Sequence, residues 1–173
     1  MIRCSIKYIS SILLILTVGY AADDSLKVGD QAHPISLLGK QAPPISLFKL
    51  ESNKYFRSKE LIGEKHLVVS FFATWCVPCA KEIPKLTEMS KELGDDFQFV
   101  LVDVKEKRDL VKKHVDKKGI SLQVVLDKYG KVFERFDGVA LPLLVVIDKN
   151  GKVTYHHTGY EEGDEVELKK HLH

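Results

Sequence analysis

The sequence predicts an α/β fold in which helices flank a mixed central β-sheet, preceded by an N-terminal extension. From residue 61 onward, apolar strand-like segments alternate with helix-like segments, an order typical of strand–helix–strand units. The apolar runs are continuous rather than alternating, as expected for strands covered on both faces. The last two strand-like segments are joined by Asn150-Gly151, which is typical of a hairpin, so the sheet should contain both strand directions.

The individual elements follow from these patterns. After one strand in the N-terminal region, the predicted strands are residues 66–73, 97–104, 122–126, 143–148 and 152–157. The predicted helices are residues 78–93, 108–118, 128–136 and 163–171. The first three helices end at or just before a glycine, a common stop signal for helices.

The strand nearest the N-terminus belongs to a short duplication. Residues 29–37 are nearly repeated by residues 39–47. A single ten-residue period is too short for a solenoid. The second copy, with Pro43 and Pro44 at its start, is the better candidate for an edge strand, where missing N–H donors are tolerated.

The first 21 residues have the pattern of a signal peptide. Arg3 and Lys7 precede an apolar run at residues 9–18, and Gly19 and Ala21 are small residues placed for a cut after Ala21. The run is shorter than the roughly 20 residues of a spanning helix, and an uncleaved N-terminal anchor is the alternative. No cysteine follows it, which disfavours a lipid-anchored start. We therefore divide the chain into residues 1–21 (signal peptide or anchor), 22–38 (extension) and 39–173 (domain).

Charge gives no support for nucleic-acid binding. Removing the leader takes two of the 26 basic residues and no acid, which leaves 24 basic against 24 acidic residues and a net charge of zero. The lysine-rich stretch at residues 105–118 is interleaved with apolar and acidic residues, which favours the solvated face of a helix.

Cysteine usage indicates chemistry rather than structural cross-linking. Of three cysteines, Cys4 lies in the predicted leader, so only Cys76 and Cys79 remain in the domain. One close pair does not make a disulfide-stapled scaffold, and a domain of this size can build a core without staples.

The two cysteines lie in the segment WCVPC, residues 75–79, between a predicted strand and a predicted helix. Residues three apart on a helical turn share one side, and their Cα separation of about 5–6 Å is within disulfide reach. The helix N-terminus should lower the pKa of Cys76 and make its sulfur the attacking one. The segment therefore predicts a redox-active dithiol.

A zinc or haem site fits these residues less well. Two cysteines supply only half of a zinc site, and the adjacent His156 and His157 would point to opposite faces of a strand. Haem attachment needs a histidine after the second cysteine, where this chain has Ala80. We expect no metal and no cofactor other than the disulfide itself.

Residues 70–84, SFFATWCVPCAKEIP, resemble the active-site segment of the thioredoxin superfamily, and specifically its secreted or membrane-tethered TlpA/ResA branch. Residues 39–47 resemble the segment that leads into that branch's domain, and residues 127–148 resemble its later half. The resemblance covers roughly residues 37–172 and implies a thioredoxin-like fold.

The resemblance also implies roles for named residues. Cys76 attacks a substrate disulfide, and Cys79, buried on the helix, resolves the mixed disulfide. Trp75 covers the site. Pro142 is expected to be a cis-proline opposite the cysteines, with the backbone of Leu141 pairing with substrate. The family often has threonine after this proline, whereas this chain has Leu143-Leu144, which predicts a more apolar rim.

Glu82 has two interpretations. Three residues after Cys79, it could be an exposed first-turn glutamate favoured by the helix dipole, which the residues alone favour. The resemblance instead favours a buried proton carrier for the resolving thiol. Thioredoxins proper have a buried aspartate six residues before the first cysteine, where this chain has Ser70.

The resemblance implies a periplasmic or membrane-tethered thiol–disulfide oxidoreductase. Pro78 is similar to reducing members. The expected partners are an integral-membrane thiol protein as electron donor and disulfides of exported proteins, apocytochrome c among them, as acceptors. The alternatives are a disulfide-forming oxidase or isomerase, a thiol peroxidase in which Thr74 assists Cys76, and a binding module with an idle cysteine pair. The sequence leaves the oligomeric state open.

Overall fold

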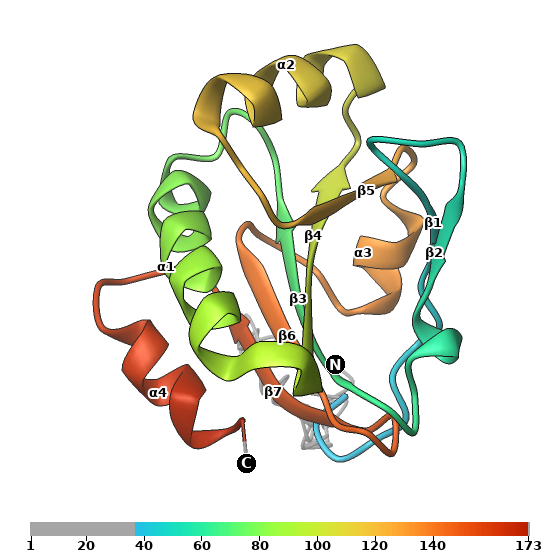
Figure 1. The fold of residues 1–173 in the computed structure, drawn as a ribbon, viewed down its shortest axis with the longest axis vertical. Helices are drawn as coiled ribbons and strands as arrows, with labels where there is room; N and C mark the ends of the chain where they lie inside the picture. Colours follow the sequence, from blue (N-terminus) through green and yellow to red (C-terminus); the bar gives the residue numbers. More distant parts are fainter. Residues whose placement is uncertain (1–36, 173) are drawn as a thin grey trace, which may run out of the picture. The chain divides into compact units, whose positions relative to one another are not determined.

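A computed structural model describes residues 37–172 of the chain (Figure 1). The predicted leader and nearly all of the predicted extension lie outside these residues. Among residues 37–172, no helix is long and apolar enough to cross a membrane.

The described residues form seven strands and four α-helices. The strands are β1 Ser46–Lys49, β2 Tyr55–Arg57, β3 His66–Phe72, β4 Phe97–Val104, β5 Gln123–Asp127, β6 Leu143–Ile147 and β7 Val153–Thr158. The α-helices are α1 Val77–Leu93, α2 Arg108–Lys118, α3 Lys131–Arg135 and α4 Asp164–Lys170. Short 3₁₀ helices lie at Ser58–Glu60 and Gly94–Asp96.

The strands form one mixed sheet in the order β2-β1-β5-β4-β3-β6-β7. β3, β4 and β5 are parallel, and the other neighbouring pairs are antiparallel. The predicted mixed α/β fold is confirmed. Because the carboxyl ends of parallel strands meet at one edge of the sheet, the residues after β3 and β4 lie side by side there.

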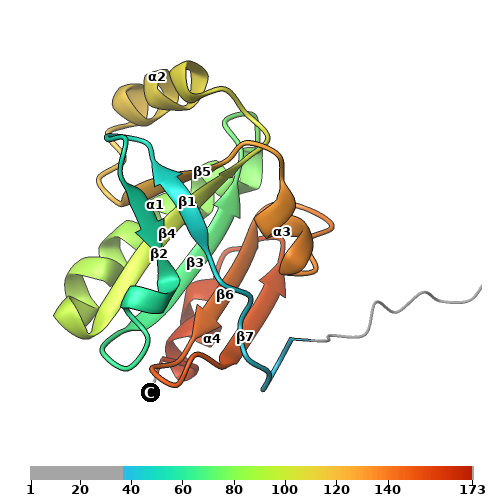
Figure 2. The ribbon, with the colours of Figure 1, turned by 90° about the vertical axis from the view of Figure 1, so that its right-hand side faces the viewer.

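Helices cover both faces of the sheet (Figures 1 and 2). One core cluster joins side chains of α1, α2 and α4 to one face of the sheet, and the second joins α3 and the segment before β1 to the other. The side chains of β3 alternate between the two clusters: Val68 and Phe72 belong to the first, Val69 and Phe71 to the second. This explains the continuous apolar run seen in the sequence.

The predicted edge strand is wrong in its position. The second repeat copy does enter the sheet, since β1 begins at Ser46, two residues after Pro44. However, β1 pairs with β2 on one side and with β5 on the other, so it lies inside the sheet. The edge beside β1 is β2, a three-residue strand with a single buried side chain, Phe56, which is too short to show a pattern in the sequence.

The helix after β5 is shorter than predicted. Gly130, with φ of +69°, closes a turn by donating its N–H to the Asp127 carbonyl at 2.9 Å, and α3 begins only at Lys131. The Asp127 carboxylate accepts from the N–H groups of Val132 and Phe133 at 2.9 and 2.8 Å. Asp127 therefore supplies the acceptor that the first turn of this helix needs.

Candidate active site

Cys76 and Cys79 lie where β3 passes into α1. Cys76 is the N-cap residue of α1, and the Cys79 N–H donates to its Sγ at 3.2 Å. The two residues form a disulfide, with their Cα atoms 5.3 Å apart. Cys76 is 5% exposed and Cys79 1%, so the first cysteine is the more accessible one. The geometry agrees with an attacking Cys76, whose thiolate a helix N-terminus stabilises.

The residues beside Cys76 form an exposed apolar surface. Trp75 is 71% exposed and Val77 is 69% exposed. Pro78 occupies the first turn of α1, where the N–H that it lacks would have no helical partner. Trp75 and Val77 can therefore meet a partner chain on either side of Cys76 in the sequence.

Glu106 fixes the loop before the disulfide and was missed in the sequence. Its carboxylate accepts from the Thr74 N–H at 2.6 Å and from the Thr74 hydroxyl at 2.8 Å. The Cys76 N–H donates to the Ala73 carbonyl at 3.1 Å, which closes the same turn. Its position after a strand could have indicated this contact. Glu106 follows β4, the parallel neighbour of β3, so the loops after these two strands lie at the same edge of the sheet.

Glu82 is buried on α1, and the interpretation as an exposed carboxylate is wrong. Its side chain is 2% exposed, and its Oε2 accepts a hydrogen bond from the Ser70 hydroxyl at 2.6 Å. Burial raises the pKa of Glu82 to about 7, and the Asp164 charge also raises it, while the Ser70 hydrogen bond opposes them. Near neutral pH this carboxyl can therefore take up or release a proton in the interior.

The Leu141–Pro142 peptide bond is cis, as predicted. Pro142 immediately precedes β6, and Leu143 at the start of β6 pairs with Phe71 of β3, so the proline lies beside the end of β3. A groove of about 280 Å³ at this edge joins Leu141 to Trp75. The structure thus brings the two predicted substrate contacts together.

The predicted apolar rim of Leu143 and Leu144 is wrong. These side chains are 0% and 3% exposed, because β6 is an interior strand with both faces covered. The apolar part of the groove comes from other residues, namely Val104, Phe133, Val139 and Ala140, with Lys105 and Glu106 as its charged members.

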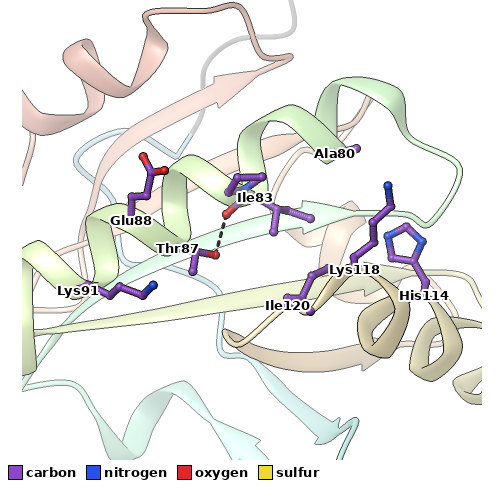
Figure 3. Close-up of a pocket in the computed structure, with 10 residues that line it drawn as sticks. Ala80, Ile83, Thr87, Glu88, Lys91, His114, Lys118 and Ile120 are labelled. Carbon is purple, nitrogen blue, oxygen red and sulfur yellow. Dashed lines mark hydrogen bonds between the residues drawn. The ribbon is translucent and has the colours of Figure 1, made fainter.

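A second groove, also of about 280 Å³, lies between α1 and α2. Figure 3 shows Ile83 and Thr87 of α1 on one side of this groove, and His114 and Lys118 of α2 together with Ile120 on the other. Thr87 does not donate into the groove, because its hydroxyl bonds the Ile83 carbonyl at 2.8 Å. His114 is half-buried, and burial lowers its pKa.

Sequence comparison relates this chain to known thioredoxin-like proteins. A family model described as Redoxin matches residues 37–172. The thioredoxin-like protein YneN of Bacillus subtilis is 27% identical over 127 residues, covering 72% of this chain and 74% of that protein. The thiol–disulfide oxidoreductase ResA of Bacillus thuringiensis is 34% identical over 98 residues, covering 55% of this chain and 54% of that protein.

The fold has counterparts among solved structures. A Chlorobium tepidum protein assigned as thiol:disulfide interchange protein DsbE superposes with a TM-score of 0.72 at 25% identity, covering 78% of this chain and 94% of that one. The chain spans only about half the length of several curated relatives, 44% of rice thioredoxin Y for example. The family match over residues 37–172 and these likenesses show that the chain belongs to the Redoxin family, among the TlpA/ResA/DsbE-like members of the thioredoxin superfamily.

Proposed function

We propose that this protein is a thiol–disulfide oxidoreductase that reduces disulfides of exported proteins through Cys76 and Cys79. The observation that carries the proposal is the disulfide at the N-terminus of α1, with Cys76 at the N-cap and Cys79 buried behind it. The Cys79 N–H donates to the Cys76 sulfur, and this contact also favours a thiolate there.

The exchange begins from the dithiol form. The Cys76 thiolate attacks one sulfur of a substrate disulfide, which forms a mixed disulfide and releases the other substrate sulfur as a thiolate. Cys79 then loses its proton and attacks the Cys76 sulfur. The Cys76–Cys79 disulfide forms, the second substrate thiol leaves, and two electrons have passed to the substrate.

Glu82 is our candidate for the proton acceptor of the second step. It lies one helical turn after Cys79, and both side chains are buried in the same helix. A carboxyl with a pKa of about 7 exists in both protonation states near neutral pH. It can therefore take the Cys79 proton during resolution and return it to solvent afterwards.

Substrate binding is assigned to the groove beside the disulfide. Trp75 supplies an exposed aromatic surface, and Leu141, two residues before β6, lines the same groove. An extended substrate segment that pairs with the Leu141 backbone in this groove would lie against Trp75, the residue before Cys76. The apolar lining favours apolar side chains next to the substrate cysteine.

The thiol-peroxidase alternative is disfavoured by one contact. It requires the Thr74 hydroxyl to assist Cys76, but that hydroxyl donates its proton to Glu106 at 2.8 Å. Thr74 therefore serves the loop rather than a bound peroxide.

Location and partners remain part of this proposal. The leader pattern and the relatedness to ResA and DsbE support a site of action outside the cytoplasm, with or without an N-terminal anchor. A membrane thiol protein would regenerate the dithiol, and disulfides of exported proteins, such as an apocytochrome c, would accept the electrons.

The reduction potential tests the reducing direction. Trp75 is the only tryptophan of the chain and adjoins Cys76, so its fluorescence can report the redox state. Equilibration with dithiol buffers should give a potential nearer to about −270 mV, as in thioredoxin, than to about −120 mV, as in the strong oxidant DsbA. A value near the latter would favour the disulfide-forming oxidase instead.

A further inference from the structure

Asp103 is a buried acid that the exchange mechanism does not use. It is the last residue but one of β4 and is 0% exposed. It pairs with Phe72 of β3 and with Leu126 of β5, so it lies in the middle of the sheet. Within residues 37–172, no donor group forms a hydrogen bond of ordinary geometry with either of its carboxyl oxygens. An unpartnered, fully buried carboxylate is costly, whereas a neutral acid is tolerated.

The face on which Asp103 lies is the face of the disulfide. Strand side chains alternate, so Asp103 shares its face with Leu101. Leu101 belongs to the same core cluster as Cys76 and Cys79. Asp103 is therefore on the side of the sheet that α1 covers.

Glu106 connects Asp103 to the redox loop. Lys105, between the two acids, lies in the short loop between β4 and α2 and has φ of +66°, which is unusual for a residue other than glycine. The Glu106 carboxylate accepts both hydrogen bonds from Thr74, two residues before Cys76. Asp103 is thus linked to the redox loop through Glu106, which interacts with Asp103 and holds Thr74, two residues before Cys76.

Neutral Asp103 is what the surrounding charges favour. Burial raises the pKa of Asp103 to about 8, and the Glu106 side chain raises it further as a hydrogen-bond acceptor and by its charge, while the Glu106 backbone N–H opposes these effects. Asp127 of β5 adds to the effect by its charge. From α2, His114 is close enough for the Glu106 charge to act on its pKa, and the Lys105 ammonium lies 3.8 Å from Glu134. In the described part of the chain no lysine or arginine forms an ion pair with Asp103 or Glu106. Protonation of Asp103 therefore removes the negative charge that no basic side chain neutralises.

We propose that Asp103 is a positioning residue of the redox site: as a neutral acid it donates its proton to Glu106 and so maintains the Glu106–Thr74 contact that places Cys76 at the start of α1. When Asp103 ionises, two carboxylates repel each other and the anchor on Thr74 weakens. The rate at which Cys76 reacts should then change with pH in a second step, caused by ionisation of Asp103 and separate from the step caused by Glu82. The inference rests on the proposed exchange at Cys76, but its readouts need no substrate protein.

The first test follows the Asp103 carboxyl itself. Carbon-13 NMR of the oxidised protein should show Asp103 titrating near pH 8. In Glu106→Gln, which keeps an acceptor but removes the charge, the midpoint should move to lower pH. A carboxyl that titrates near its ordinary value of about 4 in the wild type would overturn the proposal.

The second test follows Cys76 in the reduced protein. The rate of its alkylation by iodoacetamide, mapped by peptide, is measured from pH 5 to 9.5. Wild type should depart from a simple plateau above pH 8, and Asp103→Asn, which donates from an amide and cannot ionise, should not. The expected gap at pH 9 is at least about threefold, the scale of coupling within one hydrogen-bond network. Asp109→Asn, an exposed acid of α2, is the matched control and should follow wild type.

Thr74→Val keeps the shape of the anchored side chain but removes its hydroxyl. Because the weakened anchor is the proposed route to Cys76, this variant should shrink the pH 8 feature without moving the Asp103 titration. Identical alkylation profiles for wild type and Asp103→Asn would reject the positioning role. A Cys76 that cannot be alkylated at any pH would instead reject the proposed function, so the two failures are distinguishable.

Discussion

Replacing Glu82 by glutamine should remove a decrease in the free energy of unfolding that wild type shows as the pH rises. The folded state holds this carboxyl at a pKa of about 7, above its ordinary value of 4.5, because burial disfavours the ionised form. Between these two values the folded state therefore binds more protons than the unfolded state. Stability contributed in this way is present at low pH and is lost as pH rises through the folded pKa.

The size of the effect follows from the shift. At about 1.4 kcal/mol per pKa unit, a change from 4.5 to about 7 amounts to about 3 kcal/mol at full ionisation. The linkage relation gives a loss of about 2 kcal/mol between pH 5 and pH 7. Glutamine cannot ionise, and its amide oxygen can still accept the bond from Ser70. Any constant cost of the new amide group is the same at each pH and does not affect this slope.

Urea unfolding of the oxidised protein at pH 5, 6, 7 and 8 measures the effect as the difference in free energy between variant and wild type. Asp103 ionises in both proteins and cancels in the difference. Glu88→Gln, an exposed glutamate of the same helix, is the control and should give a flat difference. If the Glu82→Gln difference were equally flat, the buried carboxyl would have an ordinary pKa and its proposed proton transfer would lose its basis.

Three further predictions concern the exchange. In the reduced protein, iodoacetamide at mildly acidic pH should label Cys76 before Cys79, because the helix N-terminus lowers the Cys76 pKa below about 8.5; peptide mapping that found Cys79 labelled first would reverse the assignment. Cys79→Ser should accumulate reducible covalent adducts with exported proteins in the periplasm, and their absence while wild type is active would contradict the mixed-disulfide route. Glu82→Gln should slow resolution more than initial attack and flatten the pH dependence from pH 5 to 9 in stopped-flow kinetics, whereas unchanged profiles would leave Glu82 a structural residue.

Local patterns predicted the central elements well. β4 Phe97–Val104 and α2 Arg108–Lys118 begin and end at the predicted residues, because a continuous apolar run and a terminal glycine are properties of the segment itself. β2 Tyr55–Arg57 was missed because it exists only through its pairing with β1. Leu143 and Leu144 were misplaced for a related reason, since their burial depends on the interior position of β6.

The site shows the same division. Cys76 and Cys79 are neighbours in the sequence, so their pairing could be predicted from spacing. Glu82 could not be assigned from its helix alone, because its burial depends on the fold that brings Ser70 against it. Glu106 is 32 residues from Thr74 and gave no local signal. The Glu106–Thr74 contact joins the loops that follow two adjacent parallel strands, and it can be predicted only when the strand order is known.

The central claim is that Cys76 carries out thiol–disulfide exchange, and the rate of insulin reduction with dithiothreitol as electron donor tests it most directly. Wild type should accelerate the reduction, and Cys76→Ser should fall to the uncatalysed rate because Cys79, the other cysteine among residues 37–172, is buried on α1. The circular dichroism spectrum of the variant should match that of wild type, which separates lost chemistry from lost folding. A folded Cys76→Ser variant that kept the wild-type rate would contradict the account.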